Sequence, residues 1–315
     1  MNGLEVSHLK KRYGDQTVVD DLSFHVNQGE IFGLIGPNGA GKSTTMMMII
    51  GLLKMDAGTI TFDGQHYNAR NTEMRSRLGL VPQEIAVYPD LTAVQNLRFF
   101  GSLNGLRGRR LQERVDYVLE LTGLAANASH TLDTFSGGMA RRLNFGIALL
   151  HEPNFVILDE PTVGIDPQSR SNLLDCVRGL SQQGVGVLYA SHYMEEVEAV
   201  CHRVAIIDHG KLLRHGTLDE LLDRTRIDLC VRVPALSGDL VAKLRDIADV
   251  RTDSDGNMSI LVKESVEAQR AGRPGHLRVV LGILENASTP VLDIKSQETS
   301  LETLFLSLTG RTLRD

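Results

Sequence analysis

One glycine-rich segment near the N-terminus constrains what this chain can fold into more than any other feature. GPNGAGKST, residues Gly36–Thr44, directly follows the apolar run EIFGLIG and precedes an apolar helical pattern that reaches Leu53. The glycines leave backbone N–H groups open to a phosphate, Lys42 can reach the β- and γ-oxygens, and the Ser43 hydroxyl can ligate Mg²⁺. The segment therefore predicts a strand–loop–helix unit that binds a nucleoside triphosphate through the whole loop: Gly36, Pro37, Asn38, Gly39, Ala40, Gly41, Lys42, Ser43 and Thr44.

The apolar runs that follow this loop predict an α/β fold. Residues 155–159 (FVILD) and 186–190 (GVLYA) are almost continuously apolar, and helical patterns separate them. Strands that are buried on both faces have this composition, so the runs favour a parallel or mixed sheet covered by helices. Between about residues 84 and 150 the periodicity is helical, which predicts a helical subdomain.

An acidic pair ends one of these strands. Asp159 closes the FVILD run and could hold the water shell of Mg²⁺, and Glu160 follows it, placed to polarise an attacking water. An acidic pair at a strand end is usually only a solvated terminus. This pair belongs to the same predicted sheet as the phosphate loop, so we predict Asp159 as a metal ligand and Glu160 as the catalytic base.

A second anion-binding arrangement lies nearly a hundred residues after the first. In DTFSGGMARRLNF, Ser136 stands where a helix should begin, and Gly137 and Gly138 follow it. A serine cap followed by two glycines leaves open N–H groups at the positive end of the helix dipole, which favours an anion. One chain therefore contains two predicted phosphate sites.

Four further polar residues lie near the ends of predicted elements, and each has an ordinary structural interpretation when taken singly. Gln83 could be a loop residue, and Asp166 could be a helix cap before a proline at the first helical position. Tyr13 could be a half-buried strand aromatic. His192 could be an ordinary strand-end residue, although it follows an apolar strand on the edge of the sheet where a donor near the γ-phosphate would suit an ATPase.

Composition and charge exclude several other classes of protein. The formal net charge is −6, so the chain lacks the basic excess that a nucleic-acid partner needs. The three cysteines form no C-x-x-C pair, which favours a reducing compartment. The N-terminal residues lack the apolar stretch of a signal peptide, and the longest apolar run, residues 46–53, is far shorter than the roughly 20 residues that span a bilayer. We therefore expect a cytoplasmic protein.

Together, these motifs in this order resemble the nucleotide-binding subunits of ABC transporters over residues 3–222. The segment that begins at Ser136 is similar to the signature sequence of that family, with Phe135 where leucine is commonest. The resemblance implies an ABC-type P-loop ATP-binding domain at residues 1–224, with its helical subdomain at about 84–150. It also implies roles for the isolated residues: Tyr13 stacks on adenine, Gln83 senses Mg²⁺ and the membrane partner, Asp166 lies in the loop that joins two subunits, and His192 contacts the γ-phosphate.

The resemblance explains why one chain would carry two anion sites. In this family two subunits pack head to tail, so the helix that begins with Ser136, Gly137 and Gly138 caps the γ-phosphate held by the partner. This implies a homodimer with ATP and Mg²⁺ sandwiched at its interface. It also implies a separately encoded integral membrane permease, which would hold the protein at the cytoplasmic face of the inner or plasma membrane.

Residues 225–315 have a different character. Their patterns predict strands at 227–233, 250–253, 258–262 and 291–295 and helices at 236–247, 276–287 and 301–308, the last with a capping box of Thr299 and Glu302. A βαββαβ order predicts a small α+β accessory domain of ferredoxin-like type. The domain has no evident catalytic constellation, so a packing or dimer-stabilising role is favoured over a ligand sensor.

Within the family, the stretch from Ser136 to Arg170 and the closing SLETLFLSLTG look like the ATPase subunits of ABC-2 type exporters. We predict an ATPase that energises export through a separate membrane subunit. Two alternatives stay open: a soluble, non-transport ATPase of the same superfamily, and a regulatory module that holds ATP without turnover. A single ATPase half without a coiled-coil insertion disfavours the first, and the intact set of Lys42, Asp159, Glu160 and His192 disfavours the second.

Overall fold

The computed structural model describes residues 3–67, 71–222, 226–253, 255–265, 276–297 and 300–309. The chain divides into two compact units, which are Met1–Leu218 together with Phe305–Asp315, and Asp219–Leu304. The last part of the chain, which the sequence assigned to the C-terminal domain, thus clusters with the first unit. The domain boundary at residues 224 and 225 stays a prediction.

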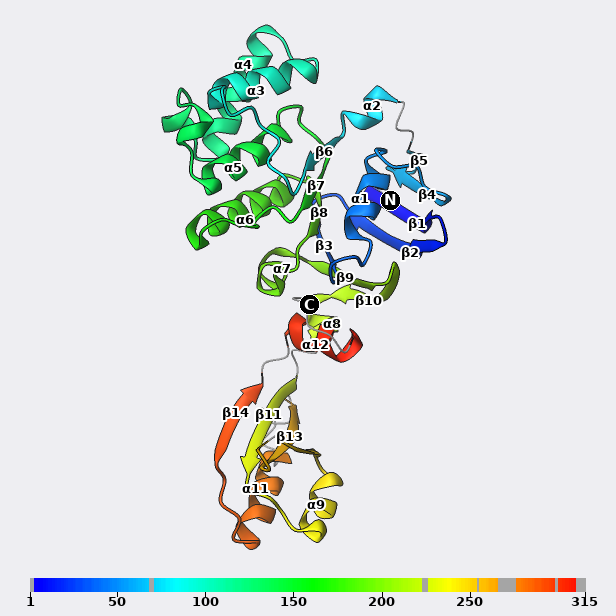
Figure 1. Cartoon of the computed structure of the whole chain (residues 1–315), viewed down its shortest axis with the longest axis vertical. Helices are drawn as coiled ribbons and strands as arrows, with labels where there is room; N and C mark the ends of the chain where they lie inside the picture. The colour runs from blue at the N-terminus through cyan, green and yellow to red at the C-terminus, as the bar shows by residue number, and fades with distance from the viewer. Residues whose placement is uncertain are drawn as a thin grey trace. The chain divides into compact units, whose positions relative to one another are not determined.

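A six-stranded sheet forms the centre of the first unit (Figure 1). Five of its strands are parallel, and only β10 runs antiparallel to its neighbour. Every residue of β3 and β8 is buried, which explains why these strands read as continuous apolar runs. The spatial order is β10 (Lys211–Thr217), β9 (Arg203–Asp208), β3 (Ile31–Ile35), β8 (Gly186–Ala190), β7 (Phe155–Asp159) and β6 (Leu78–Val81).

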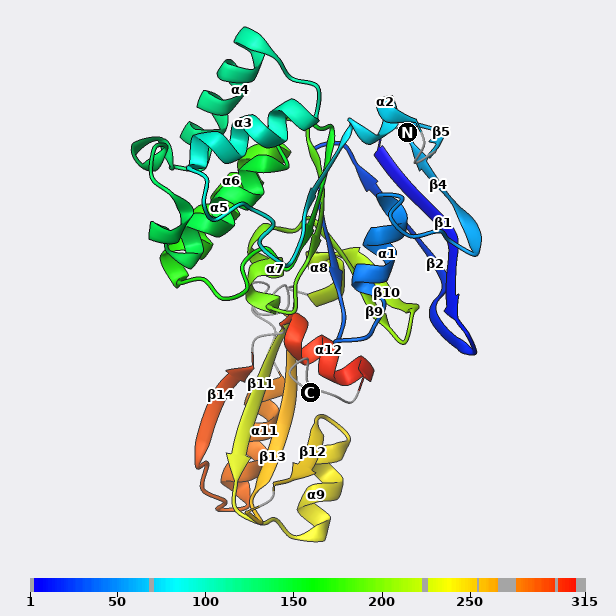
Figure 2. The ribbon, with the colours of Figure 1, turned by 45° about the horizontal axis from the view of Figure 1, so that its top comes forward.

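A smaller antiparallel sheet packs beside the central one, with α1 (Lys42–Ile49) between them (Figure 2). The buried residues of α1, among them Met46 and Ile49, join apolar side chains from both sheets in one core. The helix is shorter than the pattern to Leu53 indicated, because Gly51 adopts a left-handed φ of 75°. The strand order of this sheet is β2 (Gln16–Asn27), β1 (Gly3–Tyr13), β4 (Ala57–Phe62) and β5 (Gln65–His66).

The predicted helical stretch lies on the other side of the central sheet from α1 (Figures 1 and 2). Its three longer helices contact one another, and the third also packs on α6 (Pro167–Gln182), which covers β8 and contacts α7 (Met194–Val200). Among the helices that the structure describes, none combines the length and the apolar character needed to cross a bilayer. The remaining helical elements of this unit are α2 (Thr72–Arg75), α3 (Ala93–Leu103), α4 (Gly108–Leu121), η1 (Ala125–Asn127), η2 (Leu132–Thr134) and α5 (Gly137–Ile147). The short helix α8 (Leu218–Leu222) lies where the chain passes from the first unit to the second.

The second unit is built on an antiparallel sheet of order β12-β13-β11-β14. Alternate residues of β11 and β13 pack on two helices and form the core of the unit, as the predicted βαββαβ order requires. The elements of this unit in chain order are β11 (Arg226–Val233), α9 (Gly238–Arg245), β12 (Asp249–Thr252), β13 (Met258–Ser265), α11 (His276–Asn286) and β14 (Asp293–Gln297). The helix α12 (Leu301–Thr309) follows, and its residues from Phe305 on belong to the first unit.

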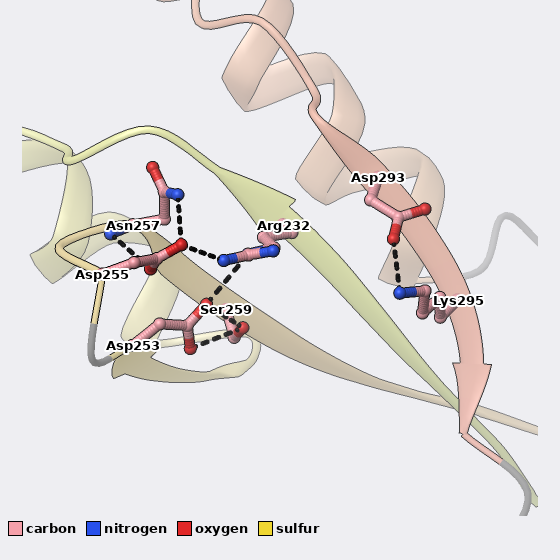
Figure 3. A network of polar contacts seen from close by, with 7 residues as sticks. All are labelled: Arg232, Asp253, Asp255, Asn257, Ser259, Asp293 and Lys295. Carbon is pink, nitrogen blue, oxygen red and sulfur yellow. Dashed lines mark hydrogen bonds and ion pairs between the residues drawn. The ribbon is translucent and has the colours of Figure 1, made fainter.

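An arginine on β11 holds the turn between β12 and β13 (Figure 3). The Arg232 guanidinium forms ion pairs with Asp253, at 3.1 Å, and with Asp255. The Ser259 hydroxyl also donates to Asp253, and the Asn257 amide donates to Asp255. Both carboxylates of the turn are therefore satisfied by neighbouring donors, and these contacts indicate a structural role.

The start of α12 shows a capping box one residue later than predicted. The Ser300 Oγ accepts the backbone N–H of Thr303 at 3.2 Å, and the Thr303 Oγ1 accepts the backbone N–H of Ser300 at 3.0 Å. Thr299, the predicted cap, lies outside the described residues.

Candidate functional site

The predicted phosphate loop joins β3 to α1, and its glycines are required by the packing of the loop itself. Gly39 and Gly41 have φ values of 81° and 101°, in the left-handed region that favours glycine. A Cβ at Gly41 would lie 2.7 Å from the carbonyl oxygen of Val18, and one at Gly36 would overlap with the carbonyl oxygen of Ile207. The loop can therefore approach the neighbouring backbone closely only with glycine at these positions.

Lys42 lies at the first position of α1 and is only 5 % exposed. Its ammonium donates to the carbonyl oxygens of Gly36 and Pro37, at 2.7 and 3.2 Å. Burial lowers the pKa of Lys42, while the carboxylates of Glu160 and Asp159 act in the opposite direction. A buried cation at the start of a helix is the charge that a bound triphosphate requires.

Two carboxylates follow β7, and their environments differ. Burial raises the pKa of Asp159, a hydrogen bond from Ser43 lowers it, and the nearby Glu160 raises it further. Glu160 is 7 % exposed and has a left-handed φ of 48°. Such a backbone costs about 1–3 kcal/mol in a non-glycine residue and persists only when the surroundings fix it. Here the backbone N–H of Glu160 is fixed by donation to the carbonyl of Ala190, at 2.9 Å.

Gln83 and His192 both reach the Glu160 carboxylate. The Gln83 Nε2 donates to the Glu160 Oε2 at 3.0 Å, and the His192 Nδ1 lies 3.2 Å from the Glu160 Oε1. The three residues follow β6, β7 and β8, so the carboxyl ends of three neighbouring parallel strands bring them together. Gln83 and His192, which had ordinary interpretations singly, are thus part of one cluster with Asp159.

Tyr13 is the last residue of β1, and 51 % of its side chain is exposed. The Lys11 ammonium lies 5.5 Å from the centroid of its ring. The exposed ring leaves an aromatic surface on which a base could stack.

The second predicted anion site has the geometry that its sequence indicated. Ser136 is the N-cap of α5, and its Oγ accepts the backbone N–H of Met139 at 3.2 Å. Gly138 packs so closely against α6 that a Cβ there would overlap with the Ser169 Oγ. Asp166 caps α6 by accepting the backbone N–H of Ser169 at 2.9 Å, and hydrogen bonds from Ser169 lower the pKa of this aspartate.

The start of α5 therefore lies beside Asp166, whereas Lys42 begins the helix on the opposite side of the central sheet (Figures 1 and 2). The structure brings the predicted residues other than Tyr13 into two groups. One group surrounds the phosphate loop, and the other is the surface formed by Ser136, Gly137, Gly138 and Asp166.

Two residues that the sequence analysis did not single out hold the Gln83 segment in place. Arg141 is 7 % exposed and donates from α5 to the carbonyls of Gln83 and Val163, the latter at 2.9 Å. Asn144, one turn later, accepts the backbone N–H of Ala86 at 3.2 Å. Both are polar residues on the buried face of a helix, and buried polar groups need partners. That position in the helical pattern is the signal that could have identified them.

The fold and this arrangement define the chain as a P-loop ATPase. A phosphate loop joins the parallel strand β3 to a helix, and an acidic pair ends β7, a parallel strand of the same sheet that is separated from β3 by β8.

Comparison with known proteins places the chain within that class. The family model described as ABC transporter matches residues 19–163. The linearmycin resistance ATP-binding protein LnrL of Bacillus subtilis (strain 168) is 43 % identical, with 99 % of this chain and 100 % of that protein covered. The Nod factor export ATP-binding protein I of Paraburkholderia xenovorans (strain LB400) is 37 % identical, with coverage of 99 % and 98 %.

A solved structure of the ATP binding subunit of an ABC transporter is 32 % identical, with a TM-score of 0.64, and covers 71 % of this chain and 93 % of that chain. The chain therefore belongs to the ABC transporter family. It is an ATP-binding subunit that hydrolyses ATP and works with a separate membrane subunit.

Proposed function

We propose that this chain hydrolyses Mg-ATP as a head-to-tail homodimer and thereby drives export through a permease that holds it at the cytoplasmic face of the membrane. The observation that carries this proposal is the Glu160 carboxylate, held by Gln83 and His192 beside the phosphate loop. Relatives named for linearmycin resistance and Nod factor export support the export direction.

The residues around the phosphate loop suit the two groups that the reaction needs. The loop N–H groups and Lys42 would hold the β- and γ-phosphates, and the exposed ring of Tyr13 would stack on adenine. The Ser43 hydroxyl, the Asp159 carboxylate and the amide oxygen of Gln83 are the hard oxygen ligands that Mg²⁺ prefers. When bound, the metal ion would neutralise charge on the phosphates.

Glu160 is the proposed general base. A water that attacks the γ-phosphorus would lose a proton to the Glu160 carboxylate as the new phosphorus–oxygen bond forms and the bond to ADP breaks. Gln83 and His192 each bind one oxygen of that carboxylate, so they fix its orientation before the reaction. Because the His192 Nδ1 is the nitrogen that faces Glu160, the Nε2 is the ring nitrogen left to contact the γ-phosphate.

The surface formed by Ser136, Gly137, Gly138 and Asp166 supports the homodimer. The N–H groups at the start of α5 lie across the central sheet from α1, so they suit the nucleotide of another copy (Figure 2). In a head-to-tail pair, each copy would supply its loop to one ATP and its Ser136 helix to the other.

An exposed aromatic cluster supports the permease as partner. Tyr88 is 48 % and Phe99 is 40 % exposed, their ring centroids lie 5.0 Å apart, and Phe100 lies against both rings. Asn96 in α3 holds the Tyr88 backbone at both its N–H and its carbonyl. This apolar patch begins five residues after Gln83, so a partner docked there would contact the segment that ends at the catalytic cluster.

The proposal is tested with Glu160→Gln, which keeps the shape of the side chain but cannot accept the proton. ATP affinity should survive, and turnover should fall by roughly 10²-fold or more. In Mg-ATP this variant should run as a dimer in gel filtration with light scattering, and in ADP as a monomer. The control is the double variant Glu160→Gln with Lys42→Ala, which lacks the cation that binds the triphosphate. It should be a monomer in Mg-ATP and in ADP.

The in-trans role of α5 is tested by adding Ser136→Arg to Glu160→Gln. The bulky cation should displace the cap from the partner's phosphate, so the double variant should stay monomeric in Mg-ATP. If the double variant dimerises as well as Glu160→Gln alone, the proposed dimer geometry is wrong.

A further inference from the structure

The first unit contains a buried carboxylate that the proposed mechanism does not use. Glu196 in α7 is 3 % exposed. Its Oε2 accepts hydroxyl groups from Thr162 at 2.7 Å, from Tyr189 at 2.8 Å and from Ser191 at 3.3 Å. Its Oε1 lies 3.1 Å from the Nε of Arg170 in α6.

The partners of Glu196 flank both residues that control the reaction. Thr162 is the second residue after Glu160, and Ser191 directly precedes His192. The Glu196 carboxylate thus joins the segment that leaves β7 to the segment that leaves β8, one step away from the 3.2 Å contact between Glu160 and His192.

The segment after His192 is held by the same cluster. The Ser191 Oγ accepts the backbone N–H of Tyr193 at 3.0 Å, and the Tyr193 ring lies 4.2 Å from the His192 ring, centroid to centroid. The Arg170 guanidinium, which is paired with Glu196, lies 4.9 Å from the centroid of the Tyr193 ring. Contacts of the residues before and after it, Ser191 and Tyr193, therefore hold His192 in place.

The Glu196 charge is compensated within the cluster. A buried carboxylate is costly unless donors or an opposite charge compensate it, and here three hydroxyls donate to the Oε2 while the Arg170 charge lies beside the Oε1. Burial and the neighbouring Glu196 charge raise the pKa of Tyr189 well above its usual value, so its phenol stays protonated and donates. Removal of the charge would leave these donors with weaker partners and free the two segments to move.

We propose that Glu196 is a positioning residue: it fixes the relative placement of Glu160 and His192 and thereby sets the rate of ATP hydrolysis. This inference rests on the proposed roles of Glu160 and His192. It predicts that loss of the Glu196 charge slows the chemical step without weakening nucleotide binding, because none of its contacts involves the phosphate loop.

The test uses the full chain with Glu196→Gln and the matched control Glu195→Gln, an exposed glutamate one residue earlier on the same helix. In Glu196→Gln, kcat should fall by about 10- to 100-fold while KM for ATP stays within about twofold, as expected for misplaced catalytic groups. Glu195→Gln should match the original chain in both constants.

A second pair of variants keeps the test decisive if Glu196→Gln does not fold. Thr162→Val removes one donor at nearly constant volume and should lower kcat, whereas Thr162→Ser retains the hydroxyl and should retain kcat. A merely structural role would lower the amount of folded Thr162→Val protein but leave kcat per folded molecule unchanged.

The outcomes separate the inference from the proposed function. If Glu160→Gln stops turnover but folded Glu196→Gln and Thr162→Val keep the original kcat, the positioning role is wrong and the proposed function stands. If Glu160→Gln keeps full turnover, the assignment of the base fails, and the role of Glu196 fails with it.

Discussion

Glu160 combines two features that are unfavourable at a single residue. Its backbone is left-handed at a φ of 48°, and its carboxylate is almost completely buried. Three contacts offset these costs. Gln83 donates to the carboxylate, the backbone N–H of Glu160 donates to the carbonyl of Ala190, and His192 lies against the other carboxylate oxygen. Strain that is held in place by neighbours is typical of a site where one geometry matters for the reaction.

A different histidine is predicted to limit stability in acid. The His151 Nε2 lies 2.8 Å from the carbonyl oxygen of Leu78, and burial lowers the pKa of this imidazole below its ordinary value of 6.5. Below that pH the unfolded chain takes up a proton that the folded chain does not. The free energy of unfolding should therefore fall as the pH drops from about 6.5 toward the lower folded pKa.

The substitution His151→Gln should remove this contribution, because glutamine can donate to Leu78 but does not titrate. Thermal midpoints measured between pH 7.5 and 5 should decline less for His151→Gln than for the original chain. His209→Gln, at an exposed histidine, is the control and should not change the slope. Parallel declines for His151→Gln and the original chain would contradict the prediction.

At the scale of elements, the junction of α5 and α6 depends on the absence of a side chain. The two helices begin side by side, each with its own cap, Ser136 for α5 and Asp166 for α6. A Cβ at Gly138 would lie 2.6 Å from the Cβ of Ser169, and Ser169 is the residue whose N–H the Asp166 cap binds. The close approach therefore ties the two helix starts, and the surface that they form, to one another.

Gly138→Ala should force the two helices apart, and this overpacking should lower the free energy of unfolding by about 1–3 kcal/mol. The thermal midpoint should therefore fall, and dimerisation in Mg-ATP should weaken. Gly137→Ala is the matched control, because the nearest atom to its Cβ would be the carbonyl oxygen of Gly164 at an ordinary 3.7 Å. Both variants are compared by calorimetry and light scattering. Equal midpoints for the two would show that the contact at Gly138 relaxes at no cost.

At the scale of the whole molecule, the chain leaves the first unit near Leu218 and returns to it at Phe305. The Phe305 side chain is 1 % exposed, and this half of α12 clusters with the ATPase unit. Every predicted site residue precedes residue 193. Nucleotide binding should therefore need neither the second sheet nor its helices, whereas stability should need α12.

We expect a chain that ends at residue 224 to bind Mg-ATP but to be less stable than one in which a flexible linker replaces residues 226–299 and α12 is kept. Phe305→Ala in the linked chain should cost about 3–5 kcal/mol and abolish that advantage. Calorimetry gives the stability and the ATP affinity of all three. The prediction fails if the truncated and linked chains have the same thermal midpoint.

The sequence by itself determined the parts of this protein that depend on local chemistry. The phosphate loop, the serine cap of α5 and the Asp159–Glu160 pair were predicted because each needs particular residue types within a few positions. The order of strands and helices in residues 225–315 was predicted because burial of one face imposes a period of 2 or 3.6. The end of α1 and the capping box of α12 were displaced because short signals such as Gly51 and Ser300 compete within a few residues.

Only the tertiary structure decided which distant residues share a site. Gln83 and Glu160 are 77 positions apart, and Arg141 and Gln83 are 58 apart, so packing of the sheet and helices sets these contacts. The placement of α1 and α5 on opposite sides of the sheet and the return of Phe305 to the first unit depend on the same packing. The physical reason is that a pattern along the chain records which groups are buried, whereas the partners of buried polar groups are chosen by the fold.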